Sequence, residues 1–152
     1  MKRILTVPLS GLYALGVGLR HILYDEHVLP TTEVSIPTIC VGNIAVGGTG
    51  KTPHVEYLIR LLSPKYKVAV LSRGYKRVTK GFIMADPQAT SQTIGDEAMQ
   101  IYLKFPEVCV AVCENRIKGI KQIQAMRPDV EVVILDDAFQ HRALKCGYNI
   151  VL

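Results

Sequence analysis

From Pro30 onward, apolar runs alternate with stretches of helical periodicity. In the stretch KTPHVEYLIRLL, for example, Val55, Leu58, Ile59 and Leu62 fall on one face of a helix. The predicted strands lie in SIPTICVGN (36–41), KVAVLSRGY (67–74), VCVAVCENR, VEVVILDD and YNIVL, and the predicted helices cover 51–62, 95–105 and 115–126. Nearly continuous apolar strands that alternate with amphipathic helices are typical of a parallel sheet covered on both faces. We therefore expect an α/β fold.

Composition limits the size of the core and the class of partner. The chain has 152 residues, of which 49% are hydrophobic, so we expect one modest core. Its net charge of +5 favours anionic partners such as nucleotide phosphates or acidic lipids. Basic segments interleaved with aromatic residues are lacking and Trp is absent, so nucleic acid is not an expected partner. The stretch 76–93 is the expected irregular insertion, with a short hairpin around 81–85.

Four cysteines stand at positions 40, 109, 113 and 146. They form no CxxC pair, and no His lies at a zinc-like spacing from them. We expect buried, reduced thiols of a cytosolic protein.

The N-terminal residues 1–30 form the first predicted unit, and residues 31–152 form the second. MKR is followed by sixteen uncharged residues, ILTVPLSGLYALGVGL. This pattern is similar to a signal peptide, but its helical spacing also fits an amphipathic helix that lies on a membrane surface or packs on the domain. The run is too short to span a bilayer. Because the chain stops at an apolar strand, we expect it to be part of a longer protein whose fold it leaves incomplete.

The stretch AVGGTGKT, residues 45–52, links the first predicted strand to the first predicted helix. A phosphate-binding loop leaves a strand, turns tightly, directs backbone N–H groups at phosphate oxygens and enters a helix. Lys51 supplies charge for the β- and γ-phosphates, and Thr52 supplies a hydroxyl for Mg²⁺. The usual pattern has glycine at the position of Ala45. We therefore expect residues 31–152 to form a nucleotide-binding domain. The residues expected to bind the nucleotide are Ala45, Val46, Gly47, Gly48, Thr49, Gly50, Lys51 and Thr52.

Polar residues follow the ends of the other predicted strands. Asp136 and Asp137 come after VVIL, at the strand end where ligands bind in open parallel sheets. One of them is expected to hold Mg²⁺. Without the phosphate-binding loop, the same two residues would also fit a simple turn. Asp96 is either a helix N-cap or a base for a substrate hydroxyl. Arg73 lies near phosphates or forms a surface ion pair. His141 follows the paired aspartates closely.

Four ordered segments, VGNIAVGGTGKTP, LSRGYKR, GDEAMQ and LDDAFQHR, resemble the tetraacyldisaccharide 4′-kinase family of the lipid A pathway. The resemblance extends through nearly the whole chain, including PLSGLYALGVGLRHILYD. It implies a P-loop NTPase-like fold preceded by a membrane-associated helix. The family has a small residue at the position of Ala45, which makes AVGGTGKT a variant phosphate-binding loop. The chain departs from the family at Ala138, where glycine is more frequent.

The resemblance implies transfer of the γ-phosphate of ATP to the 4′-hydroxyl of a tetraacylated disaccharide 1-phosphate. Asp96 matches the family's proposed catalytic carboxylate and Lys51 its phosphate-binding lysine, while Thr52, Glu97, Asp136 and Asp137 match positions expected to hold Mg²⁺. The positions expected to contact substrate are Arg73, Tyr75 and His141. The N-terminal helix implies a peripheral place on the cytoplasmic face of the bacterial inner membrane.

The family's chains are roughly twice as long, so we expect this piece alone to be inactive as a kinase. No obligate protein partner is expected. Two alternatives are a partner-dependent P-loop NTPase and a membrane-surface module that binds nucleotide only structurally. Export with a processed N-terminus is a third alternative.

Overall fold

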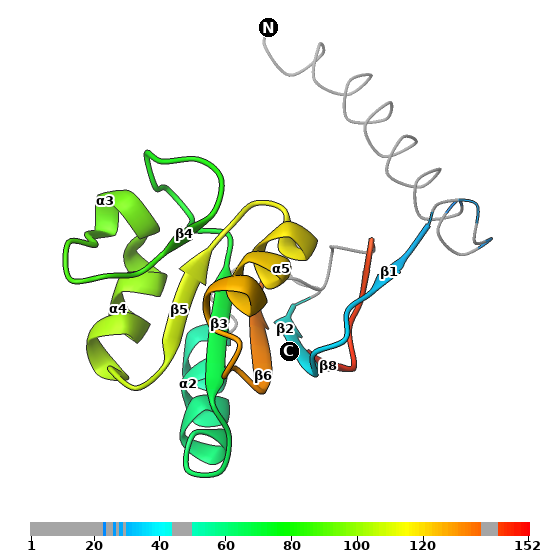
Figure 1. Cartoon of the computed structure of the whole chain (residues 1–152), viewed down its shortest axis with the longest axis horizontal. Helices are drawn as coiled ribbons and strands as arrows, with labels where there is room; N and C mark the ends of the chain where they lie inside the picture. Colours follow the sequence, from blue (N-terminus) through cyan, green and yellow to red (C-terminus); the bar gives the residue numbers. More distant parts are fainter. Residues whose placement is uncertain (1–22, 24–25, 27, 29, 44–49, 138–142) are drawn as a thin grey trace, which may run out of the picture.

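A six-stranded sheet forms the centre of the protein, as seen in a computed structural model that describes residues 23, 26, 28, 30–43, 50–137 and 143–152. The strand order is β4-β5-β3-β6-β2-β8 (Figure 1). All neighbours pair in parallel except β4 and β5, which are antiparallel. The strands are β2 (Thr38–Gly42), β3 (Val68–Ser72), β4 (Ile83–Met84), β5 (Cys109–Val112), β6 (Val132–Asp136) and β8 (Tyr148–Val151).

Helices cover both faces of this sheet, as the alternation of the sequence predicts. Side chains of successive strand residues point to opposite faces. In β3, Val70 therefore packs in one core cluster with α2 (Lys51–Leu62) and α4 (Asp96–Lys104). Its neighbour Leu71 packs in the other cluster with α5 (Arg116–Met126). The α/β class is confirmed, and the predicted helix 51–62 matches α2 residue for residue.

The insertion 76–93 is more ordered than predicted. The prediction of a hairpin around 81–85 is wrong, because β4 pairs with β5 rather than with another strand of the insertion. Main-chain pairing with an existing sheet edge satisfies more backbone groups than an isolated two-residue hairpin does. The short helix α3 (Ser91–Ile94) follows, and a reciprocal capping box between Thr90 and Thr93 fixes its start.

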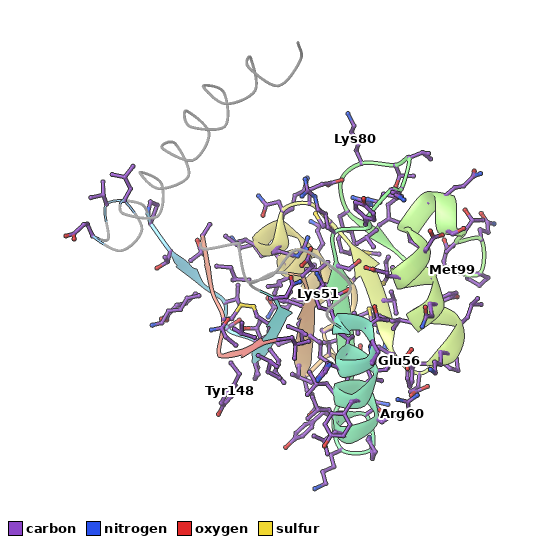
Figure 2. All side chains as sticks on the ribbon, turned by 180° about the vertical axis from the view of Figure 1, so that it is seen from behind. Lys51, Glu56, Arg60, Lys80, Met99 and Tyr148 are labelled. Atoms are coloured by element: carbon purple, nitrogen blue, oxygen red, sulfur yellow. A yellow bond between two sulfur atoms is a disulfide. The ribbon has the colours of Figure 1, made fainter. Side chains whose placement is uncertain are left out.

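Glu56 ties the two helices on one face together. It lies on α2 with only 7% of its surface exposed, and Lys51, Glu56 and Arg60 follow one another along that helix (Figure 2). The carboxylate accepts hydrogen bonds from Lys104 Nζ at 2.5 Å and Gln100 Nε2 at 3.0 Å, both on α4, and from Arg60 Nη2 at 3.3 Å. The bond from Lys104 is the main reason why the pKa of Glu56 lies below its ordinary value.

Replacing Glu56 with glutamine is expected to lower the free energy of unfolding by about 2 kcal/mol, the scale of hydrogen bonds to a charged group. Because the folded pKa is lowered, this contribution is present above the unfolded pKa and is lost as pH falls through the folded one. Urea unfolding at neutral and acidic pH measures it, with exposed Glu107→Gln as control. A Glu56→Gln protein as stable as wild type at neutral pH would contradict this role.

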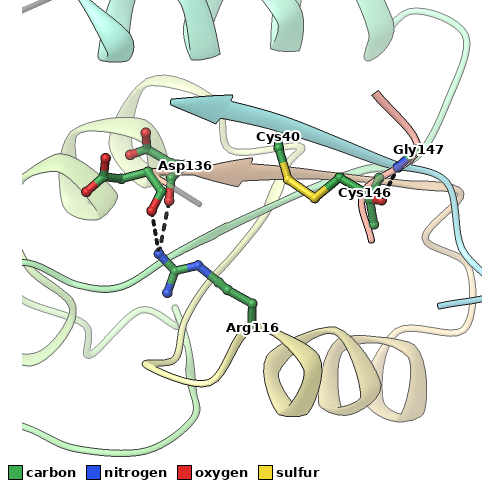
Figure 3. Close-up of a disulfide and its surroundings, with 7 residues drawn as sticks. Cys40, Arg116, Asp136, Cys146 and Gly147 are labelled. Atoms are coloured by element: carbon green, nitrogen blue, oxygen red, sulfur yellow. Dashed lines mark hydrogen bonds between the residues drawn. A yellow bond between two sulfur atoms is a disulfide. The ribbon is translucent and has the colours of Figure 1, made fainter. Parts of the chain in front are cut away.

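Two short strands and a disulfide lie beside the main sheet. β1 (Thr32–Glu33) pairs in parallel with β7 (Leu144–Lys145). The prediction of reduced thiols is wrong for Cys40 and Cys146, which form a disulfide (Figure 3). Pairing of β2 with β8 brings these residues, 106 positions apart, to a Cα–Cα distance of 6.2 Å, which a disulfide spans. Cys109 and Cys113 are free and buried, as predicted.

No helix within the described ranges is long and apolar enough to cross a membrane. The predicted N-terminal helix of residues 1–30 lies almost wholly outside the described residues. The division into units 1–30 and 31–152 therefore stays a prediction.

Candidate active site

The carboxyl ends of three adjacent strands bring the predicted site residues together. In the register of the sheet, Val41 of β2 lies opposite Asp136 of β6, and Leu71 of β3 lies opposite Leu135. The segments that follow these strands therefore meet at one edge, as expected for ligand sites in open parallel sheets. They surround a cavity of about 510 Å³, which is lined by Lys51, Ser72, Arg73, Gly74, Tyr75, Glu97, Asp136 and Asp137.

Lys51 is the first residue of α2 and connects the ends of β2 and β6. Its Nζ donates to Asp137 Oδ1 at 2.7 Å and to Asn43 Oδ1 at 3.2 Å. Gly50, at the N-cap, has a φ of 75°, which glycine adopts without strain. Thr52 is half-buried in the first turn of the helix. Residues 45–49 lie outside the described residues, so the loop itself stays a prediction.

Asp136 is a buried carboxyl group in this otherwise open cavity. It is 2% exposed, and its Oδ1 has no hydrogen-bond partner among the described residues. The pKa of Asp136 is raised to about 6, mainly by burial and further by the nearby carboxylates of Glu97 and Asp137, although the charges of Lys51 and Arg116 lower it. An acid that is partly protonated near neutral pH in a cleft is frequent at functional sites.

Asp137 follows in a conformation that non-glycine residues seldom adopt, with a φ of 53°. Its side chain is 60% exposed, in contrast to that of Asp136. The strained backbone turns two successive carboxylates in different directions, one into the protein and one toward Lys51.

Arg116, which sequence reasoning missed, holds this turn in place. It is 3% exposed and donates from Nη1 to the carbonyl of Cys113 at 2.6 Å. Its Nη2 donates to the carbonyls of Asp136 at 3.1 Å and Asp137 at 3.4 Å (Figure 3). Burial lowers its pKa from the ordinary value. One signal was present in the sequence: Arg116 opens a helix, where the helix dipole disfavours a positive charge.

The start of α4 faces the turn that follows β3. Gly95, the N-cap, has a φ of 88°, and a Cβ placed there would lie 2.9 Å from the carbonyl oxygen of Tyr75. This close approach brings Glu97 to the cavity that Arg73 and Tyr75 also line. Asp96 is exposed and does not line the cavity. The interpretation of Asp96 as the N-cap is wrong by one position, because Gly95 is the N-cap and Asp96 is the first residue of the helix.

The carboxylates of the cavity fit a magnesium ion shared with a nucleotide better than a closed metal cage. Among the described residues, no group of three His, Cys, Asp or Glu side chains is close enough to hold a metal ion alone. Mg²⁺ in phosphoryl-transfer sites is usually held by one or two carboxylates together with phosphate oxygens and water. The unpartnered oxygen of buried Asp136 and the hydroxyl of Thr52 are suitable ligands of this kind. His141 and Ala138 lie outside the described residues.

Comparisons with known proteins agree along the whole chain. The sequence model of the family "Tetraacyldisaccharide-1-P 4'-kinase" matches residues 2–152. The tetraacyldisaccharide 4'-kinase of Bacteroides fragilis is 55% identical over 146 residues, which cover 95% of this chain and 39% of that protein. That of Flavobacterium johnsoniae is 49% identical over 152 residues, which cover 100% of this chain and 45% of that protein.

A solved structure shows the same fold. The crystal structure of LpxK from Aquifex aeolicus in complex with ATP superposes with a TM-score of 0.88 at 39% identity, covering 99% of this chain and 49% of that one. The chain thus spans less than half of the length of these relatives. With a family match from residue 2 to residue 152, the chain belongs to the tetraacyldisaccharide-1-P 4′-kinase family.

Proposed function

We propose that the full-length protein transfers the γ-phosphate of ATP to the 4′-hydroxyl of a tetraacyldisaccharide 1-phosphate, a precursor of lipid A. One observation carries the proposal: four separate segments, each containing a predicted site residue, meet at the carboxyl edge of the sheet in a chain that matches this family throughout. Phosphoryl transfer needs mainly positioning and neutralisation of charge, and the cavity supplies groups for both.

On this proposal, residues 45–52 bind the phosphates of ATP and Lys51 neutralises their charge. Lys51 already lies in the cavity, where Asp137 and Asn43 fix its ammonium group. Thr52, Asp136 and Asp137 hold Mg²⁺, with help from Glu97. The ion would neutralise charge on the β- and γ-phosphates. Asp136 is suited to this because a cation would stabilise its buried carboxylate, whose Oδ1 has no hydrogen-bond partner among the described residues.

Asp96 is the proposed general base for the 4′-hydroxyl. It stands at the exposed end of α4, beside Glu97 and opposite the turn that carries Arg73 and Tyr75. An exposed carboxylate at this place is accessible to a second substrate that enters from solvent or from a membrane. Arg73, Tyr75 and His141 are proposed to contact that substrate, whose phosphate and sugar groups they are able to bind.

We place the protein at the cytoplasmic face of the bacterial inner membrane, as a peripheral protein. ATP is cytoplasmic and the acyl chains of the substrate keep it in the bilayer, so the cavity has to meet both. Residues 1–30 supply the apolar, basic-flanked segment suited to lie at that interface. Neither nucleic acid nor an obligate protein partner is part of the proposal.

Asp96→Asn in the full-length protein is expected to reduce the rate of phosphate transfer at least about a hundredfold, the usual contribution of a general base. Transfer from ATP to the tetraacyl disaccharide measures it. Asp86→Asn is the matched control, because Asp86 is an exposed aspartate whose Oδ1 accepts from the backbone N–H of Gln88, and asparagine keeps that acceptor. Full activity of Asp96→Asn would contradict the role of Asp96 as general base but not the proposed function. A wild-type protein that binds ATP but transfers no phosphate to this lipid would overturn the function.

The 152-residue chain alone is expected to show no steady transfer, because it lacks more than half of the length of its relatives. The same transfer assay on the purified chain, with the full-length protein beside it, checks this. Turnover of the disaccharide by the chain alone would contradict the expectation.

A further inference from the structure

The loop that leaves the cavity after Tyr75 reverses the usual distribution of polar and apolar side chains. Arg77 points inward, with 2% of its side chain exposed, and donates from Nη2 to Glu114 Oε1 and to the carbonyl of Gly81, both at 2.6 Å. Its neighbour Val78 is 75% exposed, and Tyr75 is 69% exposed. We refer to residues 75–80 as the rim loop.

Hydrogen bonds fix the rim loop, so the exposure of Val78 is part of a defined structure. The backbone N–H of Val78 donates to the carbonyl of Gln92 at 2.9 Å, and Thr79 Oγ1 donates to the carbonyl of Thr93 at 2.6 Å. Lys76 has a φ of 61°, a conformation that a non-glycine residue keeps only where its surroundings fix it. A protein that buries an arginine and displays a valine here gains no stability from the valine.

The exposed side chains of the rim loop combine apolar and cationic groups. Lys76 lies over the ring of Tyr75, with its Nζ 5.3 Å from the ring centre. Lys80 projects from the tip of the loop (Figure 2). Neither lysine forms an ion pair with any residue that the structure describes. Tyr, an aliphatic side chain and lysines are the residues that settle at the headgroup level of an anionic bilayer.

The rim loop is also in the right place to meet a membrane. Tyr75 lines the cavity, and the loop stands over the carboxyl edge of the sheet (Figure 1). The strand that follows it, β4, forms the edge of the six-stranded sheet. The lysines and the exposed apolar side chains of the rim loop favour an anionic bilayer as its occupant.

We propose that the rim loop is a membrane contact that holds the mouth of the cavity at the headgroups of an anionic bilayer. This inference rests on the proposed function, because an acylated substrate that stays in the membrane has to reach the cavity from that side. Val78 enters the interface, while Lys76 and Lys80 bind lipid phosphates. The contact is separate from the one proposed for residues 1–30 and adds to it.

The test compares full-length wild type with Val78→Asp/Lys80→Glu and with the matched pair Leu103→Asp/Lys65→Glu. Leu103 is an apolar residue of similar exposure near the C-terminal end of α4, and Lys65 is an exposed lysine in the turn after α2. Flotation without ATP measures binding to vesicles of phosphatidylethanolamine and phosphatidylglycerol. Kinetics are measured with substrate carried in these vesicles and with substrate dispersed in detergent.

The rim-loop variant is expected to bind the vesicles more than about tenfold more weakly, since each basic residue near an anionic surface adds about fivefold in affinity. Its KM for vesicle-borne substrate rises to a similar extent, kcat stays the same, and detergent-dispersed substrate shows no difference. The control pair behaves as wild type. Unchanged vesicle binding would overturn the proposal. An equal rise in KM with detergent-dispersed substrate would overturn it too, and would indicate that the loop contacts the substrate's acyl chains. A lowered melting temperature would indicate that the two side chains pack against the rest of the protein.

These outcomes are distinct from failure of the proposed function. Flotation needs neither ATP nor the disaccharide, so weaker vesicle binding by the rim-loop variant supports the membrane contact whatever the enzyme phosphorylates. A wild-type protein without transfer activity would overturn the proposed function. The membrane contact would still be tested by flotation.

Discussion

Asp136→Asn is expected to make the protein more stable near neutral pH and inactive at the same time. The carboxylate of Asp136 is almost fully buried, and one oxygen has no hydrogen-bond partner among the described residues. In the proposed reaction its charge is needed to hold Mg²⁺. Loss of this group is expected to reduce phosphate transfer at least about a thousandfold, the upper end for one preorganised electrostatic contact.

The gain in stability follows from the raised pKa of Asp136. In the folded protein this pKa is about 6, above the ordinary value of 3.8, so the folded state binds the proton more tightly than the unfolded chain. The free energy of unfolding therefore falls as pH rises from 3.8 through about 6, and the penalty is fully present above that range. The shift corresponds to about 3 kcal/mol at most. Because the amide of asparagine needs a partner of its own, we expect a net gain of about 1 to 2 kcal/mol.

Urea unfolding with a metal chelator present, from about pH 5 to about pH 8, measures this effect. Wild type is expected to lose stability over the lower part of this range, and Asp136→Asn is expected to be nearly independent of pH there. Added Mg²⁺ should stabilise wild type more than the variant, since a ligand stabilises only the state that binds it. The exposed Asp86→Asn serves as control. A variant less stable than wild type near pH 8, or one that still transfers phosphate, would contradict the account.

Periodicity predicted the sheet and its covering helices well, because both depend on local patterns. The run TICVG became β2, and VVILD became β6, next to each other and in parallel. The prediction that acids after VVIL lie near GKT followed from this, since the carboxyl ends of adjacent parallel strands share one edge. Lys51 Nζ and Asp137 Oδ1, 86 residues apart in the sequence, lie 2.7 Å apart in the structure.

Contacts that depend on three-dimensional register were not predictable from the sequence. Cys40 and Cys146 have no spacing that signals a pair, and only the pairing of β2 with β8 brings them together. The role of Arg116 was not predictable either, because its three acceptors are backbone carbonyls, which no sequence pattern marks. The roles of residues 45–49 and His141 stay predictions, as they lie outside the described residues.

Gly95→Ala is expected to destabilise the protein by about 3 kcal/mol. It is also expected to move the turn after β3 away from the start of α4. Gly95 has φ 88° and ψ 156°, a region open almost only to glycine, and occupying it costs other residues about 1 to 3 kcal/mol. A Cβ would also lie 2.9 Å from the carbonyl oxygen of Tyr75 and 3.1 Å from the carbonyl carbon of Gly74. These are backbone atoms, so the turn after β3 has to move away from α4.

Gly81→Ala separates the cost of strain from the cost of this contact. Gly81 also has a positive φ, 79°, but a Cβ there meets no atom within 4 Å. We expect it to cost about 1 kcal/mol, the penalty of the left-handed conformation alone, and to leave transfer unchanged. The difference between the two variants in urea unfolding then measures the contact of Gly95 with the turn. For Gly95→Ala the KM for the lipid should rise in the fraction that stays folded, because Arg73 and Tyr75 shift relative to Asp96 and Glu97. If the two variants lost equal stability, or if Gly95→Ala kept wild-type kinetics, the close packing of these turns would not be what positions the substrate.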